Sequence, residues 1–252
     1  MGKIFLSAVN NTLSGDIFIT DHNADKLAQI KKEFSQVNLA SDNAEAVAGA
    51  DLIILAVKPQ SFGELAAEIS GKITDNAVVL SIMAGVKMEK ISSALGAKKI
   101  VRAMPNLGAR VGKSMTVWHG QSLTAKDLKV IKTLFQSIGQ ELEVKSEDFI
   151  DKATAVSGSG PGFFYYIIDN WIKAAVNLGF SEAEAKLLIM TTVDGANEVM
   201  KTDKNPGELV SQVASKGGTT EAGLRVLQTA NLAALWQEVL RAAYNRASEL
   251  NS

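Results

Sequence analysis

The stretch that decides the fold is Asp51-Leu52-Ile53-Ile54-Leu55-Ala56-Val57, a continuous apolar run of β-type residues. Three further runs of this kind occur in the first half of the chain, separated by amphipathic stretches. A strand, a helix and another strand repeated at this spacing indicate parallel pairing with right-handed crossovers, in a sheet covered on both faces. The further strands are predicted at 16–20, 77–82 and 99–103, and the helices at 24–34, 61–69 and 88–95.

Composition excludes several classes of function. The chain has 252 residues, 46% of them apolar, which is enough for two domains with buried cores. A formal charge of −1 gives no basic field for nucleic acid and no polybasic membrane anchor. Without a signal peptide or a long apolar segment, we expect a cytoplasmic protein. There is no cysteine, and His22 and His119 are far apart in the sequence, so we expect an organic cofactor rather than a metal.

Parallel sheets of this kind bind ligands beyond the carboxyl ends of their strands, so the residues that follow each strand are candidates. Asp21 follows the first predicted strand, where an acidic residue often binds ribose hydroxyls of NAD. An equal alternative is that Asp21 caps the next helix. The other candidate segments are Lys58-Pro59-Gln60, Met83-Ala84-Gly85-Val86 and Met104-Pro105-Asn106.

In the second half of the chain the alternation of strands and helices gives way to helices alone. Two edge strands, at 114–118 and 141–144, are predicted to flank a helix at 124–137, and the chain is wholly helical from Glu147 onward. The helix at 163–178 is too apolar to be exposed on any side, so we expect it to lie in a core or a subunit interface. The glycine-rich segment 157–162 is predicted to separate a helix at 149–156 from the helix at 163–178. Later helices are predicted at 182–200, from Pro206, from about 221, and at 227–250.

Ser215-Lys216-Gly217-Gly218-Thr219-Thr220 has the composition of an anion-binding loop. Paired glycines let a backbone approach a ligand closely, and the N–H groups at a helix start attract a carboxylate. A threonine hydroxyl there can donate or accept a proton. The alternative is a turn with a helix N-cap and no ligand.

Five motifs stand in a fixed order across nearly the whole chain: Ala56-Val57-Lys58-Pro59-Gln60, Ser81-Ile82-Met83-Ala84-Gly85-Val86, Arg102-Ala103-Met104-Pro105-Asn106, Ser157-Gly158-Ser159-Gly160-Pro161 and Gly217-Gly218-Thr219-Thr220. In order and spacing they resemble the pyrroline-5-carboxylate reductase family. The resemblance implies a Rossmann-like dinucleotide-binding domain at 1–146 and an all-α dimerisation and substrate domain at 147–252. It also implies a homodimer, with further assembly in some members.

The resemblance further implies hydride transfer from NADPH or NADH to 1-pyrroline-5-carboxylate, giving L-proline. By this resemblance the loop from Ser215 through Gly217, Gly218 and Thr219 holds the substrate carboxylate, and Thr220 is the catalytic hydroxyl at the ring nitrogen. The sequence does not decide between the two cofactors. The positions expected to line the cofactor are Asp21, Asn43, Ala56, Lys58, Pro59, Ala84, Gly85 and Asn106.

The chain departs from the family pattern in three places. No G-x-G-x-x-G cluster occurs before Gly85, and 3–9 is predicted to be the helix that follows the family's first strand and glycine loop, both of which are then missing. The alternative is that 3–9 is itself that strand. Lys216 replaces a usual proline, and Gly162 a common alanine. The missing glycines and Lys216 support a second hypothesis, a reductase-like binding or regulatory protein with impaired catalysis.

Overall fold

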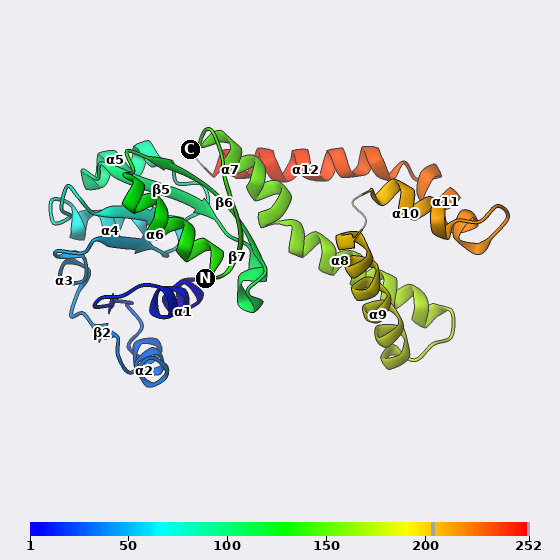
Figure 1. Cartoon of the computed structure of the whole chain (residues 1–252), viewed down its shortest axis with the longest axis horizontal. Helices are drawn as coiled ribbons and strands as arrows, with labels where there is room; N and C mark the ends of the chain where they lie inside the picture. Colours follow the sequence, from blue (N-terminus) through cyan, green and yellow to red (C-terminus); the bar gives the residue numbers. More distant parts are fainter. Residues whose placement is uncertain (203–204, 251–252) are drawn as a thin grey trace. The chain divides into compact units, whose positions relative to one another are not determined.

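Five strands in the order β3-β4-β5-β6-β7 form the main sheet of the computed structural model, which describes residues 1–202 and 205–250 (Figure 1). The first three strands are parallel, β6 is antiparallel to β5, and β7 is parallel to β6. The predicted doubly wound α/β sheet is therefore confirmed. The strands are β3 (Leu52–Leu55), β4 (Val78–Ser81), β5 (Lys99–Met104), β6 (Ser114–Gln121) and β7 (Gly139–Glu143).

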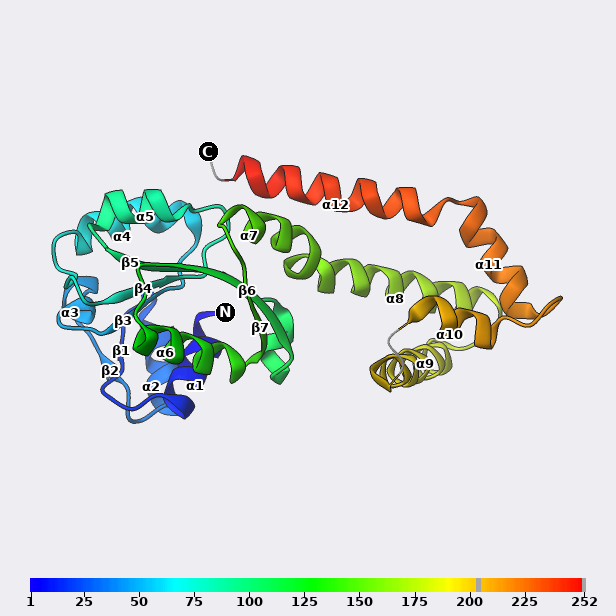
Figure 2. The same ribbon diagram turned by 45° about the horizontal axis from the view of Figure 1, so that its top comes forward.

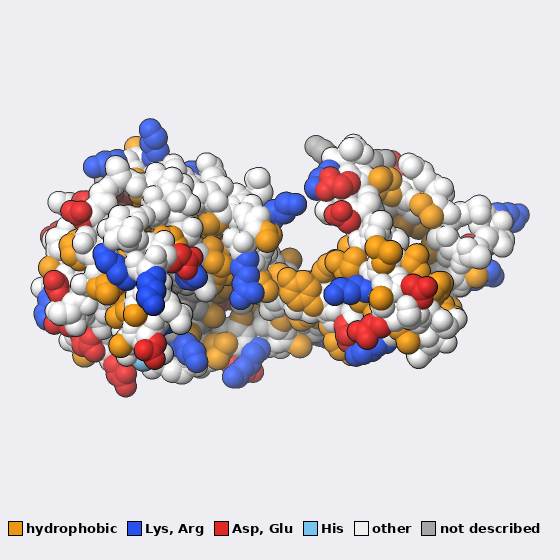
Figure 3. Space-filling model, turned by 90° about the horizontal axis from the view of Figure 1, so that it is seen from below, with side chains coloured by type: hydrophobic (Ala, Val, Ile, Leu, Met, Phe, Trp, Pro, Cys, Tyr) orange, Lys and Arg blue, Asp and Glu red, His pale blue; other side chains and the backbone are white. Residues whose placement is uncertain are grey.

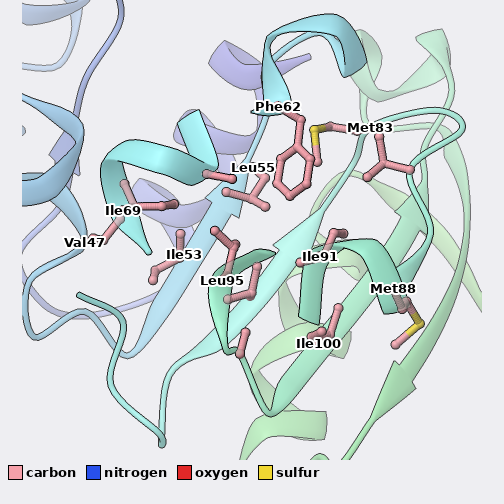
Figure 4. Close-up of a cluster of buried hydrophobic side chains, with 14 of the residues drawn as sticks. Val47, Ile53, Leu55, Phe62, Ile69, Met83, Met88, Ile91, Leu95 and Ile100 are labelled. Carbon is pink, nitrogen blue, oxygen red and sulfur yellow. The ribbon is translucent and has the colours of Figure 1, made fainter. Parts of the chain in front are cut away.

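Helices cover both faces of this sheet (Figure 2). On one face, α4 (Phe62–Ile69) and α5 (Met88–Leu95) pack against the strands through the buried side chains shown in Figure 4, such as Phe62, Ile91 and Ile100. On the other face, α1 (Gly2–Thr12) and α6 (Ala125–Gln136) cover Leu80 and Trp118. Successive β4 side chains thus point to opposite helix layers, which explains why that strand reads as a continuous apolar run.

A second, smaller sheet lies beside the first. It contains β1 (Phe18–Ile19) and β2 (Asn38–Leu39), which pair in parallel, with α2 (Ala24–Glu33) between them and α3 (Asn43–Val47) after them. Among the described residues, neither strand pairs with β3. The predicted helix at 3–9 is confirmed as part of α1, and α1 joins the two sheets: Phe5 packs in the main-sheet cluster and Leu6 packs with Phe34 and Val37 beside β1.

The prediction that the strand at 114–118 is an edge strand was wrong. β6 lies between β5 and β7, and Ser114 and Thr116 are buried in it. Their hydroxyl oxygens are 3.1 Å apart and hydrogen-bond to each other. Polar side chains that satisfy one another in this way can occupy an interior strand, although their alternation with apolar residues resembles the pattern of an exposed edge.

Seven helical segments follow β7 in the part of the chain that the structure describes. The interruption predicted at 157–162 lies a little earlier, because a π-turn at Thr154–Gly158 and the non-helical Ser159 stand between α7 and α8. The two predicted helices from about 221 and at 227–250 are both present, but the boundary lies later, where Asn231 adopts a left-handed φ of 51° between Thr229 and Leu232. The segments are α7 (Asp148–Ala153), the π-turn η3 (Thr154–Gly158), α8 (Gly160–Asn177), α9 (Glu182–Thr202), α10 (Pro206–Val213), α11 (Thr219–Thr229) and α12 (Leu232–Glu249).

The chain divides into two compact units, one of Met1–Pro161 with the C-terminal residues from Ala242 onward and one of Gly162–Arg241. Hydrophobic side chains gather on the surface of the second unit in Figure 3. In α8 only Ile168 is buried, whereas Tyr166 is 71% exposed and Leu178 83%. Of the two alternatives for this helix, the exposure favours a subunit interface. Among residues 1–202 and 205–250, no helix combines the length and apolar character needed to cross a membrane.

A buried ion cluster ties the main sheet to α7. Arg102, on β5, donates at 2.8 Å to Glu147 and at 2.7 Å to Asp151, and its side chain is 1% exposed. The same Glu147 oxygen accepts the backbone N–H of Met88 at 2.8 Å, at the start of α5. Arg102 thereby attaches α7 to β5, and its partner Glu147 attaches the start of α7 to the start of α5.

We expect Asp151→Ala to lower the free energy of unfolding by about 3 kcal/mol, because it leaves a buried guanidinium short of one carboxylate. Urea unfolding followed by circular dichroism measures this. The matched control is Asp169→Ala, which removes an exposed pair with Lys173 and should cost under about 1 kcal/mol. Equal losses for the two variants would show that the Arg102 cluster does not stabilise the sheet.

Candidate functional site

The loop after β3 lies at the carboxyl edge of the main sheet, next to the start of α1. Lys58 is exposed and immediately precedes the short helical turn η1 (Pro59–Ser61), which Pro59 begins. A Cβ built on Gly2 would lie 3.3 Å from the Cβ of Ala56, so the first N–H groups of α1 lie beside this loop. A helix start and a lysine at the end of a parallel strand suit a pyrophosphate, so this part of the site fits a dinucleotide.

Gly85 follows β4 and has a left-handed φ of 71°. A Cβ on Gly85 would lie only 2.6 Å from the backbone oxygen of Leu250. Leu250, the residue after α12, therefore lies directly against the Gly85 backbone, while Ala84 is half-buried. The position requires glycine for both its conformation and its neighbour.

Asp21 follows β1, but Asp21 does not cap α2; Asn23 does, by accepting the N–H of Lys26 at 2.9 Å. The Asp21 carboxylate instead accepts the N–H of Asn23 at 3.1 Å and bonds to the Lys26 ammonium. Partial burial raises the pKa of Asp21, but these two hydrogen bonds outweigh it, so the pKa lies below its usual value. Asp21 is therefore an ionised acceptor at neutral pH.

Asn43 is the first residue of α3, and its amide donates to Glu68 at 2.5 Å. Within residues 1–202 and 205–250, neither Asn43 nor Asp21 shares a hydrogen bond with the loops after β3, β4 or β5, so these two residues form a separate part of the proposed site.

Asn106 follows β5 and has both polar atoms of its side chain engaged. Its oxygen accepts the N–H of Gly108 at 3.0 Å, and its nitrogen donates to the carbonyl oxygen of Ser157 at 3.0 Å. Gly108 has no room for a side chain, since a Cβ there would lie 2.3 Å from the oxygen of Lys113. The bond to Ser157 joins the sheet edge to the π-turn, and sequence reasoning did not predict it.

The substrate loop predicted from the sequence precedes α11 in the second unit. Gly217 has a left-handed φ of 77°, and its N–H donates to the carboxylate of Glu221 at 2.7 Å. The N–H of Gly218 donates to the oxygen of Ser215 at 2.9 Å. A Cβ on Gly218 would lie 2.5 Å from the Ser215 hydroxyl oxygen and 3.0 Å from its backbone oxygen, so a side chain at this position would require Ser215 to move.

Helix α11 begins directly after this turn, with Gly218 as its N-cap and no side-chain capping bond. The N–H groups of the first turn of a helix have no acceptor within the helix, so those of Thr219 and Thr220 are available to an anion. Thr220 is half-buried and Thr219 is exposed. Sequence reasoning missed Glu221 as the acceptor for Gly217; a glutamate at the third position of a helix is the signal that indicates such a contact.

The family models match both parts of the chain. Residues 147–250 match the model for pyrroline-5-carboxylate reductase dimerisation, and residues 1–85 match that for NADP oxidoreductase, coenzyme F420-dependent. The chain is 32% identical to a pyrroline-5-carboxylate reductase of Staphylococcus aureus, over 99% of this chain and 93% of that protein. The chain belongs to the pyrroline-5-carboxylate reductase family.

Solved structures of pyrroline-5-carboxylate reductases have the same fold. The enzyme from Coxiella burnetii is 32% identical, with a TM-score of 0.87 over 100% of this chain and 95% of that one. The enzyme from Plasmodium falciparum, solved with NADP bound, is 26% identical, with a TM-score of 0.85 over the same shares. The Rossmann-like sheet and the helical dimerisation domain expected from the sequence are thus both confirmed.

We expect Glu221→Ala to speed hydrogen exchange at the Gly217 amide by about tenfold, because the variant removes a charged acceptor worth roughly 1.5 to 3 kcal/mol when fully formed and less at an exposed site. Mass spectrometry of the deuterated loop peptide measures the change. The control is Glu182→Ala, an acidic residue in the first turn of α9. Unchanged protection at Gly217 would contradict the contact.

Proposed function

We propose that this chain reduces 1-pyrroline-5-carboxylate to L-proline, using NADPH or NADH. The observation that carries the proposal is the similarity to pyrroline-5-carboxylate reductases along the whole chain, in sequence and in fold. The first hypothesis from the sequence therefore stands. The second, a binding or regulatory relative with impaired catalysis, receives no support, because the relatives are named as reductases.

The reaction adds a hydride to C5 of the substrate's C=N bond and a proton to its nitrogen. The reduced nicotinamide supplies the hydride when it is bound. For the substrate, we propose that the loop from Ser215 to Thr219 holds the carboxylate, with the N–H groups of Thr219 and Thr220 as donors and Gly217 and Gly218 shaping the turn. The Thr220 hydroxyl then faces the ring nitrogen, where it hydrogen-bonds to the imine and assists its protonation.

For the cofactor, we propose that the first turn of α1 and Lys58 bind the phosphates, and that Asp21 lies at the adenosine ribose. An ionised Asp21 favours ribose hydroxyls over a 2′-phosphate, whereas its neighbour Lys26 reduces that preference. The proposal therefore names either NADH or NADPH as the cofactor. The other residues proposed to line the cofactor are Asn43, Ala56, Pro59, Ala84, Gly85 and the backbone of Asn106.

We also propose a functional boundary between 146 and 147, with the second part forming the homodimer. The match of 147–250 to a dimerisation family and the exposed apolar side chains of α8 support both points. A cytoplasmic location completes the proposal, because the reaction consumes a reduced nicotinamide, a cofactor maintained inside cells.

Loss of absorbance at 340 nm with NADPH or NADH and pyrroline-5-carboxylate tests the activity. We expect Thr220→Ala to lower kcat roughly 100-fold, the size of a typical acid–base contribution, while the Kd of the cofactor changes by less than about twofold. Thr220→Ser, which keeps the hydroxyl, should retain most of the activity. Equal kcat values for Thr220→Ala and the parent would remove Thr220 from the mechanism, and an inactive parent would refute the function.

We expect the protein to be a dimer in solution and Tyr166→Glu to weaken it at least tenfold, because a charge buried in an apolar interface costs more than about 1.4 kcal/mol. Sedimentation equilibrium measures the dissociation constant. Glu182→Gln, a change at an exposed acidic position on α9, is the control. A parent that is monomeric at micromolar concentration would contradict the proposed dimer.

A further inference from the structure

The junction between α7 and α8 contains a backbone carbonyl that the helix cannot satisfy in the ordinary way. In an α-helix, the carbonyl of Ser157 would accept the N–H of residue 161. Residue 161 is proline, which has no N–H. Because an unpaired carbonyl at a partly buried site is costly, a donor from elsewhere is needed.

Asn106 supplies that donor. Its side-chain nitrogen lies 3.0 Å from the Ser157 oxygen, and the contact is partly buried. The Asn106 side chain is held in place from its other end, since its oxygen accepts the N–H of Gly108, while its backbone N–H donates to the Ser114 hydroxyl at 3.1 Å. The amide therefore reaches Ser157 from a rigid turn rather than from a mobile loop.

The backbone hydrogen bonding between α7 and α8 also departs from that of a regular α-helix. The N–H of Ser159 bonds to the oxygen of Thr154 at 2.8 Å, a span of five residues that makes the turn a π-turn. Such turns are uncommon and occur often at functional sites. Gly158, inside the turn, is close to Met104 at the end of β5, because a Cβ there would lie 3.5 Å from the Met104 Cγ.

We propose that Asn106 is a positioning residue, which replaces the N–H that Pro161 lacks and so fixes the start of α8 against the end of β5. The proposal rests on the proposed function, because α8 leads from the unit that carries the proposed cofactor loops into the unit that carries the substrate loop. Asn106 acts through Ser157, whose carbonyl oxygen its side chain contacts.

The test is a double-mutant cycle in the full-length protein. Asn106→Asp keeps an oxygen that can accept the Gly108 N–H but turns the donor to Ser157 into a second acceptor. Pro161→Ala restores a backbone N–H four residues after Ser157. Asn11→Asp, at an exposed position, controls for the added charge. The measurements are kcat and KM for pyrroline-5-carboxylate, the Kd of NADPH from fluorescence, and the melting temperature.

We expect Asn106→Asp to lower kcat about tenfold, as a small misplacement of reacting groups does, with the Kd of NADPH within about twofold of the parent's. Adding Pro161→Ala should restore at least half of the lost kcat, and Pro161→Ala alone should change it less than about twofold. A loss of NADPH affinity that Pro161→Ala does not restore would overturn the proposal in favour of direct cofactor contact.

Two further outcomes also decide the question. A lower melting temperature for Asn106→Asp with unchanged kcat would reduce Asn106 to a purely structural role and overturn the positioning proposal. If the parent does not reduce pyrroline-5-carboxylate, the proposed function fails, and the melting temperatures alone test the contact. Recovery of the melting temperature in the double variant then supports it, and additive losses overturn it.

Discussion

The buried guanidinium of Arg102 is the interaction on which the arrangement of the first unit depends. A charge at 1% side-chain exposure is tolerated only with partners, and the two carboxylates that it contacts both belong to the segment that leaves the sheet. Because Glu147 also accepts the N–H of Met88, the same cluster sets the start of α5. The two ion pairs of Arg102 thus hold α7, the first helix after the sheet, against β5.

The main sheet and the small sheet are held together by side chains rather than by backbone pairing. Among the described residues β1 and β3 share no ladder, and α1 joins the sheets through Phe5 on one side and Leu6 on the other. Burial of two such side chains contributes roughly 1.5 to 3 kcal/mol each. Apolar contacts are less directional than the hydrogen bonds of a strand pair.

Much of the fold followed from the sequence because apolar periodicity reports burial directly; α5 was predicted from Met88 to Leu95, as observed. The errors arose where the structural role of a residue depends on contacts with residues that are distant in the sequence. Pro161 looks like a helix breaker until Asn106, which is 55 positions earlier, satisfies the carbonyl of Ser157. Asn231 ends one helix through a left-handed backbone, which its sequence context does not indicate. The roles of Asn106 and Glu221 depend on such contacts and were missed for the same reason.

The glycines of the proposed substrate loop contribute conformation rather than donors. Both of their N–H groups are bonded inside the loop, to Glu221 and to Ser215, so a bound carboxylate depends on the first-turn N–H groups of α11. The carboxylate of Glu221 would repel that anion, but Arg225 lies 3.9 Å from it and Lys216 is exposed one residue before Gly217. These cations offset the local negative charge, so under the proposed function Lys216 would help the helix start to attract a carboxylate while Glu221 holds the turn in shape.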